Sequence, residues 1–494
     1  MPLENEGFVE QNSNTYKSEY KTKNAGCKIY DNFTLIVENF LNLLGSVLIV
    51  TYLLASPCCM LKEEIGRSYL ISGLLTSAGI SCLIVGIISS KLTITGAHRL
   101  GYLVCTLVFL KQENQYCPSY GDIYAMGQQR RTLEWQKRLQ VIQGAVFAAC
   151  TVQILIALVG NYSVSLPVAI APTIILCSIS VMKTSAVDMA VTCWSLFILY
   201  VGLLSVIGVW IICAVLSSFE LVWIRSAART DVYTGVLNYA ATFRISYFFQ
   251  WGLPKWKLDA ISIILPAAFI SIFEILANYY IISGKQSRGK VLPSEYNLLL
   301  KNNWTIFIIW EAFLCLISTM IGVALGVNVT YKKTKQKFHE IFVGIALILI
   351  ASWGTFCALL VTIPEPIMAA FSFLVFLFML FEGINLIQCI NMKLNRNLHV
   401  LGVSLFFGLI LPTFAKNGTL DKLTGFALLD DILVSVLSME FVVGGLVAVI
   451  IDNLIEVFGE TEYVQYTNEN STEIVEKDVE NSIKFCDCLS PFFI

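Results

Sequence analysis

The chain has 494 residues, of which 56% are hydrophobic and only 14% are charged, and its mean hydropathy is +0.72. Because a soluble domain carries about 25% charged residues, this composition excludes a protein that buries all its apolar surface in one water-soluble core. The formal net charge of −2 and the lack of a basic tail in the sequence argue against a nucleic-acid partner. We therefore expect a multi-pass integral membrane protein with the lipid bilayer as its solvent.

Both ends of the chain are polar. Residues 1–32 are charged and lack the short apolar region and small-residue cleavage site of a signal peptide. Residues 453–494 are polar and acidic. We expect these two segments to be cytoplasmic tails on either side of a transmembrane domain at residues 33–452.

The apolar runs between the tails predict the membrane-spanning helices. A helix needs about 20 apolar residues to cross the hydrocarbon layer. Runs near or above this length are Phe33–Ala55, Tyr69–Ser89, Leu139–Gly160, Leu166–Met182, Ala186–Val222, Leu258–Ser283, Thr305–Gly326, Phe338–Thr362, Met368–Ile387, Asn397–Phe414 and Ile432–Ile451.

The run Ala186–Val222 has an unusual length. It is too long for one helix of ordinary tilt and barely long enough for two. Because Gly202 and Gly208 offer a turn, we expect either a tight two-helix hairpin or one long tilted helix.

Some segments predict broken helices. Leu92–Leu110 is a weaker span because His98 and Arg99 interrupt it. Its start, Lys91–Leu100, reads KLTITGAHRL, which predicts a short strand leading into a half-helix, with an ordinary re-entrant loop as the alternative. Pro364–Pro366 marks another sharp interruption. Transporters place such irregular backbone at mid-membrane, where it lines a substrate cavity.

Glu274 lies in the middle of the apolar run Leu258–Ser283. A carboxylate at the centre of a span costs several kcal/mol unless it faces a cavity or a partner, so Glu274 is a candidate functional residue. The alternative is a protonated or hydrogen-bonded carboxyl that only packs helices together.

The cysteines predict no metal site. Most of the 15 cysteines lie inside apolar runs, where they act as small hydrophobic side chains, and no spacing resembles a zinc site. Cys117 lies in a polar loop and can be oxidised, but its partner is not evident from the sequence.

Basic clusters at residues 285–290 and 332–337 predict a cytoplasmic face there. Basic residues in the loop 111–138 weaken the asymmetry.

Several collinear motifs resemble those of the nucleobase–ascorbate transporter family, and of its animal members most closely. The resemblance runs from about Phe40 to Asn453. Its motifs are IQGA (Ile142–Ala145), APT (Ala171–Thr173), RTDVYTGVL (Arg229–Leu237), FFQWGLP (Phe248–Pro254), TIPEP (Thr362–Pro366), NRNLHVLGVSLFFGLILP (Asn395–Pro412), FVVGG (Phe441–Gly445) and IIDN (Ile450–Asn453).

The resemblance implies an all-α polytopic membrane protein built from two inverted repeats of about seven segments. Segments 3 and 10 would each contain a short strand. A core domain at about 33–160 and 258–362 would hold the substrate, and a gate domain at about 165–222 and 368–452 would form a homodimer contact. The implied function is secondary active transport of a nucleobase, urate or ascorbate by elevator motion in the plasma membrane, with no enzymatic activity and no cofactor.

The resemblance also assigns candidate site residues. Glu274 matches a family glutamate that hydrogen-bonds the N–H edge of a nucleobase, and Glu311 matches a family glutamate in the ninth segment. Helix N-termini and backbone N–H groups in segments 3 and 10 would face the substrate. The implied substrate-binding residues are Glu274, Gly96, Ala97, His98, Gly326 and Val327, and the implied ion-coupling residues are Asn278 and Glu311.

The chain also departs from the family pattern. Glu38-Asn39 replaces a Gln-His pair, and Asn278 replaces the aspartate associated with ion coupling. Coupling to sodium or a proton is then expected to be weak or to use another acid, such as Glu311 or Glu382.

Two further departures affect the expected pocket. His98 and Arg99 bring positive charge to it, which either favours an anion such as ascorbate or urate or means that the pocket is filled. The chain is shorter than the family pattern between Tyr200 and Val209 and between Gly322 and Lys337. The alternative function is therefore a transport-inactive homologue that acts as a dimer partner or regulator, or an incomplete gene model.

Overall fold

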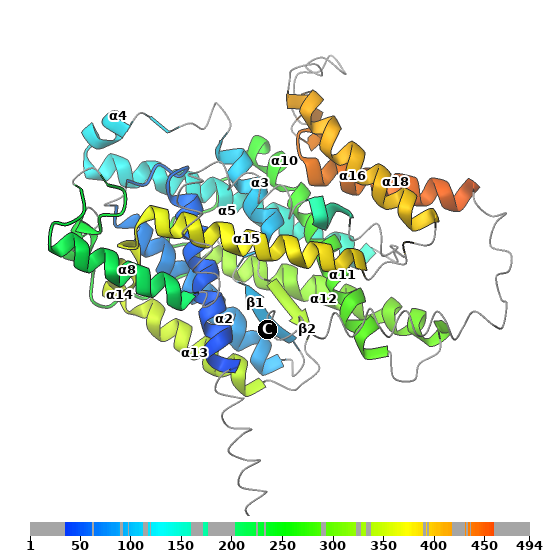
Figure 1. Ribbon diagram of the computed structural model, residues 1–494, viewed down its shortest axis with the longest axis horizontal. Helices are drawn as coiled ribbons and strands as arrows, with labels where there is room; N and C mark the ends of the chain where they lie inside the picture. The colour runs from blue at the N-terminus through cyan, green and yellow to red at the C-terminus, as the bar shows by residue number, and fades with distance from the viewer. Residues whose placement is uncertain are drawn as a thin grey trace, which may run out of the picture.

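The computed structural model describes residues 35–61, 64–88, 92–96, 98–111, 117–118, 120–159, 171–175, 203–223, 226–231, 234–287, 293–322, 328–331, 337–388, 392, 395–416, 430, 433–434 and 436–458. The protein is mostly helical over these residues (Figure 1).

A first helix, Leu35–Ala55, precedes the labelled elements. The others follow in the order α2 (Gly66–Ile88), β1 (Leu92–Gly96), α3 (Leu100–Leu110), α4 (Tyr120–Ala125), α5 (Gln128–Val159), α8 (Leu203–Ser218), α9 (Gly235–Tyr239), α10 (Leu258–Ile264), α11 (Pro266–Ser287), α12 (Pro293–Ile321), β2 (Asn328–Tyr331), α13 (Lys337–Ser352), α14 (Gly354–Val361), α15 (Glu365–Gln388), α16 (Asn395–Lys416) and α18 (Glu440–Phe458).

Within the described part, five helices are long and apolar enough to cross a membrane, and the count rises to six if α14 and α15 form one broken span. The predicted interruption at Pro364–Pro366 is confirmed, because α14 and the start of α15 meet at an angle of 88°. These apolar helices confirm the prediction of an integral membrane protein.

Two short strands lie next to each other although more than 200 residues separate them in the sequence (Figure 1). β1 and β2 pair antiparallel, with Leu92 opposite Tyr331 and Gly96 opposite Asn328. The register is irregular between Ile94 and Gly96. β1 falls in the segment whose alternating β-branched residues predict a strand, and α3 begins shortly after it at Leu100.

Glycines allow two of the helices to pack closely. α2 lies along α13, and a Cβ added to Gly79 would be 2.9 Å from the carbonyl oxygen of Gly344. A Cβ added to Gly344 would be 2.8 Å from the carbonyl oxygen of Gly79. The two backbones therefore approach at a point where only glycine fits, as membrane helix pairs with small interface residues do.

α16 and α18 form a second closely packed pair, drawn in orange in Figure 1. A Cβ added to Gly408 would be 3.0 Å from the Cα of Gly444, so this crossing is also tight. Arg396 donates to Asp452 across the pair at 3.1 Å and 2.9 Å. α18 begins at Glu440 and continues past Asp452 to Phe458.

Two sequence-based expectations about element boundaries are wrong. The run Phe338–Thr362 is two helices, α13 and α14, because the chain breaks at Trp353, where Phe243 pairs with it in an isolated antiparallel bridge. The predicted span at Leu258–Ser283 is borne out, because Leu258–Leu276 is long and apolar enough to cross a membrane, although a turn residue at Leu265 divides it into α10 and α11. Gly208 makes no turn, because α8 runs through it.

Residues 186–202 of the run Ala186–Val222, including Gly202, lie outside the described residues, so the choice between a hairpin and one long helix stays a prediction.

The helix Leu35–Ala55 ends in a turn that positions a cysteine. The N–H of Met60 donates to the carbonyl of Ala55, and the N–H of Cys59 donates to the carbonyl of Ser56. This is a Schellman arrangement, in which the residue after the helix adopts a left-handed backbone. Cys59 has a φ of 65°, a conformation that costs a non-glycine residue about 1–2 kcal/mol.

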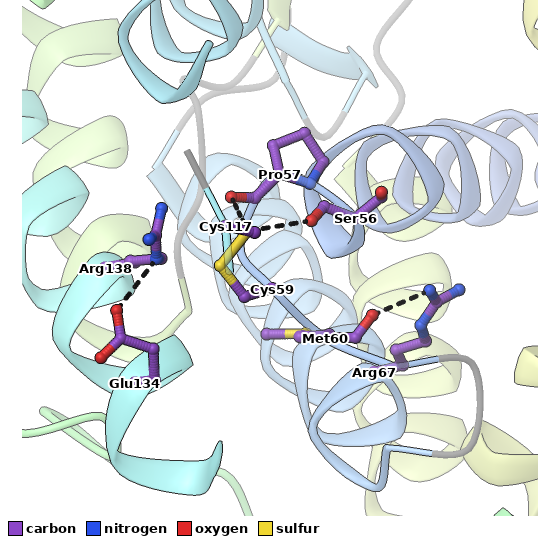
Figure 2. Close-up of a disulfide and its surroundings, with 8 residues drawn as sticks. All are labelled: Ser56, Pro57, Cys59, Met60, Arg67, Cys117, Glu134 and Arg138. Atoms are coloured by element: carbon purple, nitrogen blue, oxygen red, sulfur yellow. Dashed lines mark hydrogen bonds and ion pairs between the residues drawn. A yellow bond between two sulfur atoms is a disulfide. The ribbon is translucent and has the colours of Figure 1, made fainter. Parts of the chain in front are cut away.

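Cys59 forms a disulfide with Cys117, which supplies the partner that the sequence does not reveal (Figure 2). Their Cα atoms are 5.5 Å apart, and 58 residues separate them in the sequence. The sulfur of Cys117 lies 3.4 Å from the carbonyl oxygen of Pro57. The bond joins the turn before α2 to the loop after α3.

The neighbouring Cys58 does not compete for this bond. Its side chain is fully buried, and burial raises the pKa of its thiol to about 12, although Arg138 partly opposes the shift. Since the thiolate is the form that attacks a disulfide, Cys58 is a poor nucleophile towards the Cys59–Cys117 bond.

Candidate functional site

The N-terminus of α3 places an arginine inside the helical core. Arg99 is the residue before α3 and has extended backbone angles, with φ of −99° and ψ of 134°. Its side chain makes no capping bond to the helix. A cation is disfavoured at a helix N-terminus because the partial charge there is positive. Arg99 must therefore be held in place by negative groups from other elements.

Glu311 on α12 and Glu274 on α11 supply those groups. Arg99 Nε donates to Glu311 Oε1 at 2.7 Å, and its Nη2 donates to Glu311 Oε2, so this contact is bidentate. Arg99 Nη1 donates to Glu274 Oε2 at 3.0 Å. One guanidinium group thus bridges two carboxylates from two helices, using the fork of N–H donors that only arginine has.

The three side chains differ in exposure. Those of Arg99 and Glu311 are each 2% exposed, whereas that of Glu274 is 10% exposed. Only one oxygen of Glu274 accepts a bond from Arg99, against both oxygens of Glu311. Glu274 is therefore the member of this cluster that is best placed to accept a hydrogen bond from another molecule.

Burial makes the charge balance important. An unpaired ion costs several kcal/mol in a low-dielectric interior, and breaking a buried pair by removing one partner costs about 3–5 kcal/mol. With both carboxylates ionised, Arg99 leaves the cluster with one net negative charge. This remaining charge favours a ligand that donates hydrogen bonds or carries a proton.

A chain of hydrogen-bonding side chains continues from the cluster along α3, α5 and α12. Tyr102, one turn after Arg99 on α3, donates to Gln153 Oε1 at 3.1 Å. The sulfur atoms of Cys150 on α5 and Cys315 on α12 are 3.0 Å apart. Cys315 follows Glu311 by one helical turn, so these polar groups lie on the same face of α12.

Several buried polar atoms near these positions have no hydrogen-bond partner among the described residues. His98 precedes Arg99, is 6% exposed, and its Nδ1 atom has none. The same holds for Gln153 Nε2, for Thr106 Oγ1 on α3 and for Ser271 Oγ on α11. Because such atoms normally find a partner, these suit contact with bound water or a polar ligand.

The structure brings some of the sequence-predicted site residues together. Glu274 and Glu311 share Arg99, and His98 is next to it in the chain. Gly96 ends β1, opposite Asn328. Ala97, Gly326 and Val327 lie outside the described residues.

Asn278 lies in α11 one turn after Glu274, so its Cα is on the same face of the helix, but its side chain is outside the described part. The same is true of the side chain of Glu382 in α15.

A second buried polar contact involves one of the departures from the family pattern. Asn39, in the first helix, donates from Nδ2 to Glu340 Oε1 on α13 at 3.1 Å. Glu340 is 1% exposed. This contact ties the first helix to α13 and lies outside the Arg99 cluster.

Sequence reasoning did not single out Tyr102, Gln153, Cys150 and Cys315. A signal for them exists, because polar side chains that recur at helical spacing inside an apolar run indicate one polar face. Gln143 and Gln153 in α5 follow this pattern, and Gln143 donates to the carbonyl of Thr319 at 2.9 Å.

Comparison with known proteins assigns the chain to a family. The model of the xanthine/uracil Permease family matches residues 164–416, just over half of the chain. This match takes in α11 and α12, which carry Glu274 and Glu311.

Individual relatives cover more of the chain. Solute carrier family 23 member 1 of Mus musculus is 26% identical over 476 residues, which cover 85% of this chain and 77% of that protein. Solute carrier family 23 member 2 of Homo sapiens is 25% identical over 481 residues, which cover 85% of this chain and 72% of that protein. Nucleobase-ascorbate transporter 5 of Arabidopsis thaliana is 26% identical over 242 residues, 46% of this chain and 44% of that protein. The chain is thus a transport protein rather than an enzyme, and it belongs to the nucleobase–ascorbate transporters of the permease family as a divergent member.

Proposed function

We propose that this protein is a secondary active transporter of a nucleobase or ascorbate. The observation that carries the proposal is the Arg99–Glu274–Glu311 cluster, buried where a strand is followed by a half-helix. An ionisable group inside a membrane protein marks a substrate or ion path more often than a packing contact. The name of the relative from Arabidopsis, Nucleobase-ascorbate transporter 5, supports this substrate class.

In this proposal Glu274 contacts the substrate. Its second carboxylate oxygen accepts an N–H of a nucleobase ring or a hydroxyl of ascorbate, while Arg99 holds the first. The N–H groups at the start of α3 and the side chain of His98 face the carbonyl or anionic oxygens of the same ligand. Gly96 allows the ligand to approach the backbone at the end of β1. Ala97, Gly326 and Val327 complete the proposed set of substrate-binding residues.

The proposed movement is an elevator. A core domain, about residues 33–160 and 258–362, would slide against a gate domain, about residues 165–222 and 368–452. One supporting contact is the ion pair between Arg67 on α2 and Glu365 at the start of α15, whose charged atoms are 3.7 Å apart. This pair joins the proposed core to the edge of the proposed gate and would break and re-form in each cycle.

We also propose a plasma-membrane homodimer formed through the gate helices. α16 and α18 leave apolar side chains such as Phe406, Phe414, Leu446 and Ile450 exposed on the single chain. Cross-linking of intact cells through single cysteines introduced at Phe406 and Ile450 would distinguish a dimer from a monomer, since both positions face outward.

The test of transport is uptake of radiolabelled uracil, xanthine, urate and ascorbate into cells that express the chain. Each compound is measured in sodium chloride and in choline chloride, with cells carrying an empty vector as the control. Saturable uptake of at least one compound, which the same unlabelled compound suppresses, is the expected result. Absence of uptake of all four, with the protein shown at the cell surface, contradicts the proposal.

One observation favours a second candidate function. Arg99 pairs with both carboxylates without any ligand, so the chain can also serve as a transport-inactive partner or regulator of a related permease. Co-expression with a transport-active relative distinguishes the two functions. A regulator changes the uptake rate of that relative and contributes no saturable uptake when it is expressed alone.

A further inference from the structure

We propose that the guanidinium group of Arg99 is a resident cation that permanently occupies the position between Glu274 and Glu311, in place of an exchangeable metal ion. For its consequence in transport this inference rests on the proposed function. The occupancy of the site can be tested without any transport.

The hydrogen-bond geometry favours a resident guanidinium group. Arg99 directs three N–H groups at the two carboxylates, with N–O distances of 2.7 Å to Glu311 and 3.0 Å to Glu274 for the two longer bonds. Both oxygens of Glu311 accept from it. A sodium ion placed between the same carboxylates would share those oxygens with a positive group a few ångströms away, and the repulsion between like charges is strong in a low dielectric.

The position of Arg99 in the fold also favours a resident cation. It precedes α3, where the helix disfavours a cation, and its side chain is 2% exposed. Nothing in the local sequence holds the side chain there, because it makes no capping bond. The two carboxylates are therefore the groups that retain Arg99, and Arg99 is in turn the positive charge that allows both to be buried.

Removal of Arg99 would leave a site that requires a cation. Glu311 and Glu274 would remain as two buried carboxylates facing a space of guanidinium size. Such a space has the charge and the shape to bind a free planar cation with several N–H donors. It would bind a smaller cation such as sodium less well, since carboxylates set apart for a fork of donors do not close around a point charge.

The consequence for transport is that this chain runs its cycle without sodium at this position. Because the guanidinium group is covalently part of the chain, it cannot leave with the substrate. The gradient of a free cation therefore cannot drive transport by binding at Glu274 and Glu311. Arg99 is thus a positioning residue that fixes which ion the site uses.

The test measures thermal stability of the purified protein in detergent. The unmodified chain and Arg99→Ala are melted in choline chloride, in sodium chloride and in choline chloride with a few millimolar guanidinium. Arg396→Ala is the matched control, because Arg396 also pairs with a carboxylate between two helices but at a different place. We expect the melting temperature of the unmodified chain to be the same in all three solutions. We expect the same of Arg396→Ala, whatever its own melting temperature is.

We expect Arg99→Ala to melt well below the unmodified chain, and guanidinium to restore several degrees of that loss. Sodium should restore less. Arg99→Ala combined with Glu311→Gln should lose the response to guanidinium, because one carboxylate then no longer requires a cation. If Arg99→Ala cannot be purified without guanidinium but can be with it, the same conclusion follows.

Two results would overturn the proposal. One is a rise in the melting temperature of the unmodified chain with sodium that Glu311→Gln abolishes, since an exchangeable ion would then bind beside Arg99. The other is an Arg99→Ala protein that guanidinium does not stabilise: either it is folded and its melting temperature does not change with guanidinium, or it fails to fold both with and without guanidinium. Both readouts are independent of uptake, so a failure to transport any compound leaves this inference standing.

Discussion

At the scale of single residues, Glu274 and Glu311 have different tasks although both contact Arg99. Glu311 gives both oxygens to the guanidinium group, while Glu274 gives one and is the more exposed of the two. A carboxylate with one oxygen in reserve can bind a ligand without releasing its internal partner. A substrate therefore need not break the ion pair in order to bind.

We expect Glu274→Gln to lose nucleobase or ascorbate uptake while it keeps its surface expression. The glutamine oxygen can still accept from Arg99, but the amide N–H₂ then faces the donors of the substrate. Since a hydrogen bond to a charged group contributes about 1.5–3 kcal/mol, uptake at low substrate concentration should fall by about 10- to 100-fold. Radiolabelled uptake and surface biotinylation check this, and Glu220→Gln on an exposed turn is the control. Full uptake by Glu274→Gln would remove Glu274 from the site.

Asn278 gives a second prediction at this scale. Any transport by the unmodified chain should depend on sodium weakly or not at all, because an amide oxygen brings no charge to a hard cation. Asn278→Asp adds a carboxylate one turn from Glu274 on α11, so we expect uptake to become more dependent on sodium. The measurement is uptake as a function of sodium concentration at constant ionic strength. Steep sodium dependence of the unmodified chain near physiological concentrations would contradict this interpretation.

At the scale of elements, close glycine contacts determine how α2 and α13 cross. Gly79 and Gly344 face each other's backbone, so any larger side chain must push the helices apart. α2 leads directly into the segment that contains β1, Arg99 and α3. A shift of α2 would therefore also move the charged cluster.

We expect Gly79→Leu to destabilise the protein by more than the 1–3 kcal/mol that overpacking typically costs, because the obstacle is backbone rather than a movable side chain. Gly402→Leu is the matched control: Gly402 is also in a helix, but a Cβ there meets nothing within 4 Å. The yield of monodisperse protein in detergent and its melting temperature should fall for Gly79→Leu and stay unchanged for Gly402→Leu. Equal behaviour of the two variants would show that the crossing tolerates bulk.

The sequence predicted the spans better than the breaks, for a physical reason. Apolar length is a local property that lipid selects directly, so Gly66–Ile88 and Asn395–Lys416 agree closely with the predicted runs. The break at Trp353 depends on its pairing with Phe243, over 100 residues earlier, and the adjacent Gly354 is too weak a local signal to mark it, because a single glycine inside an apolar helical run is tolerated. In the same way, the sequence indicated charge at Arg99 but not that the guanidinium group would bridge Glu274 and Glu311.

At the scale of the whole molecule, the disulfide determines which side of the membrane each end of the core faces. Cys59 follows the first helix and Cys117 follows α3, and the bond between them requires both to be on one side of the membrane. α2 must therefore cross the membrane to the opposite side, and the β1–α3 segment must return the chain to the side of Cys59. Disulfides persist in oxidising compartments and are rare in the cytosol. Cys59 and Cys117 are therefore expected outside the cytoplasm, with Leu35 at the start of the first helix on the cytoplasmic side.

We expect a membrane-impermeant maleimide to label Cys59 and Cys117 on intact cells only after treatment with an impermeant reductant. The double variant Cys59→Ser, Cys117→Ser should show no such labelling. In the chain-entropy account, loss of the bond should also lower stability by about 2–4 kcal/mol, measured as a lower melting temperature. Labelling that requires permeabilised cells would reverse the assigned orientation.

The disulfide also has a mechanical consequence. If the chain were pulled out of a bilayer by its ends, the 58-residue stretch between the two cysteines could not extend while the bond was intact. At about 3.5 Å per extended residue, roughly 200 Å of contour length would be withheld from the force–distance trace and would appear after reduction. That withheld stretch contains α2, β1 and α3, so the segment that carries Arg99 would be the part of the molecule protected from stretching.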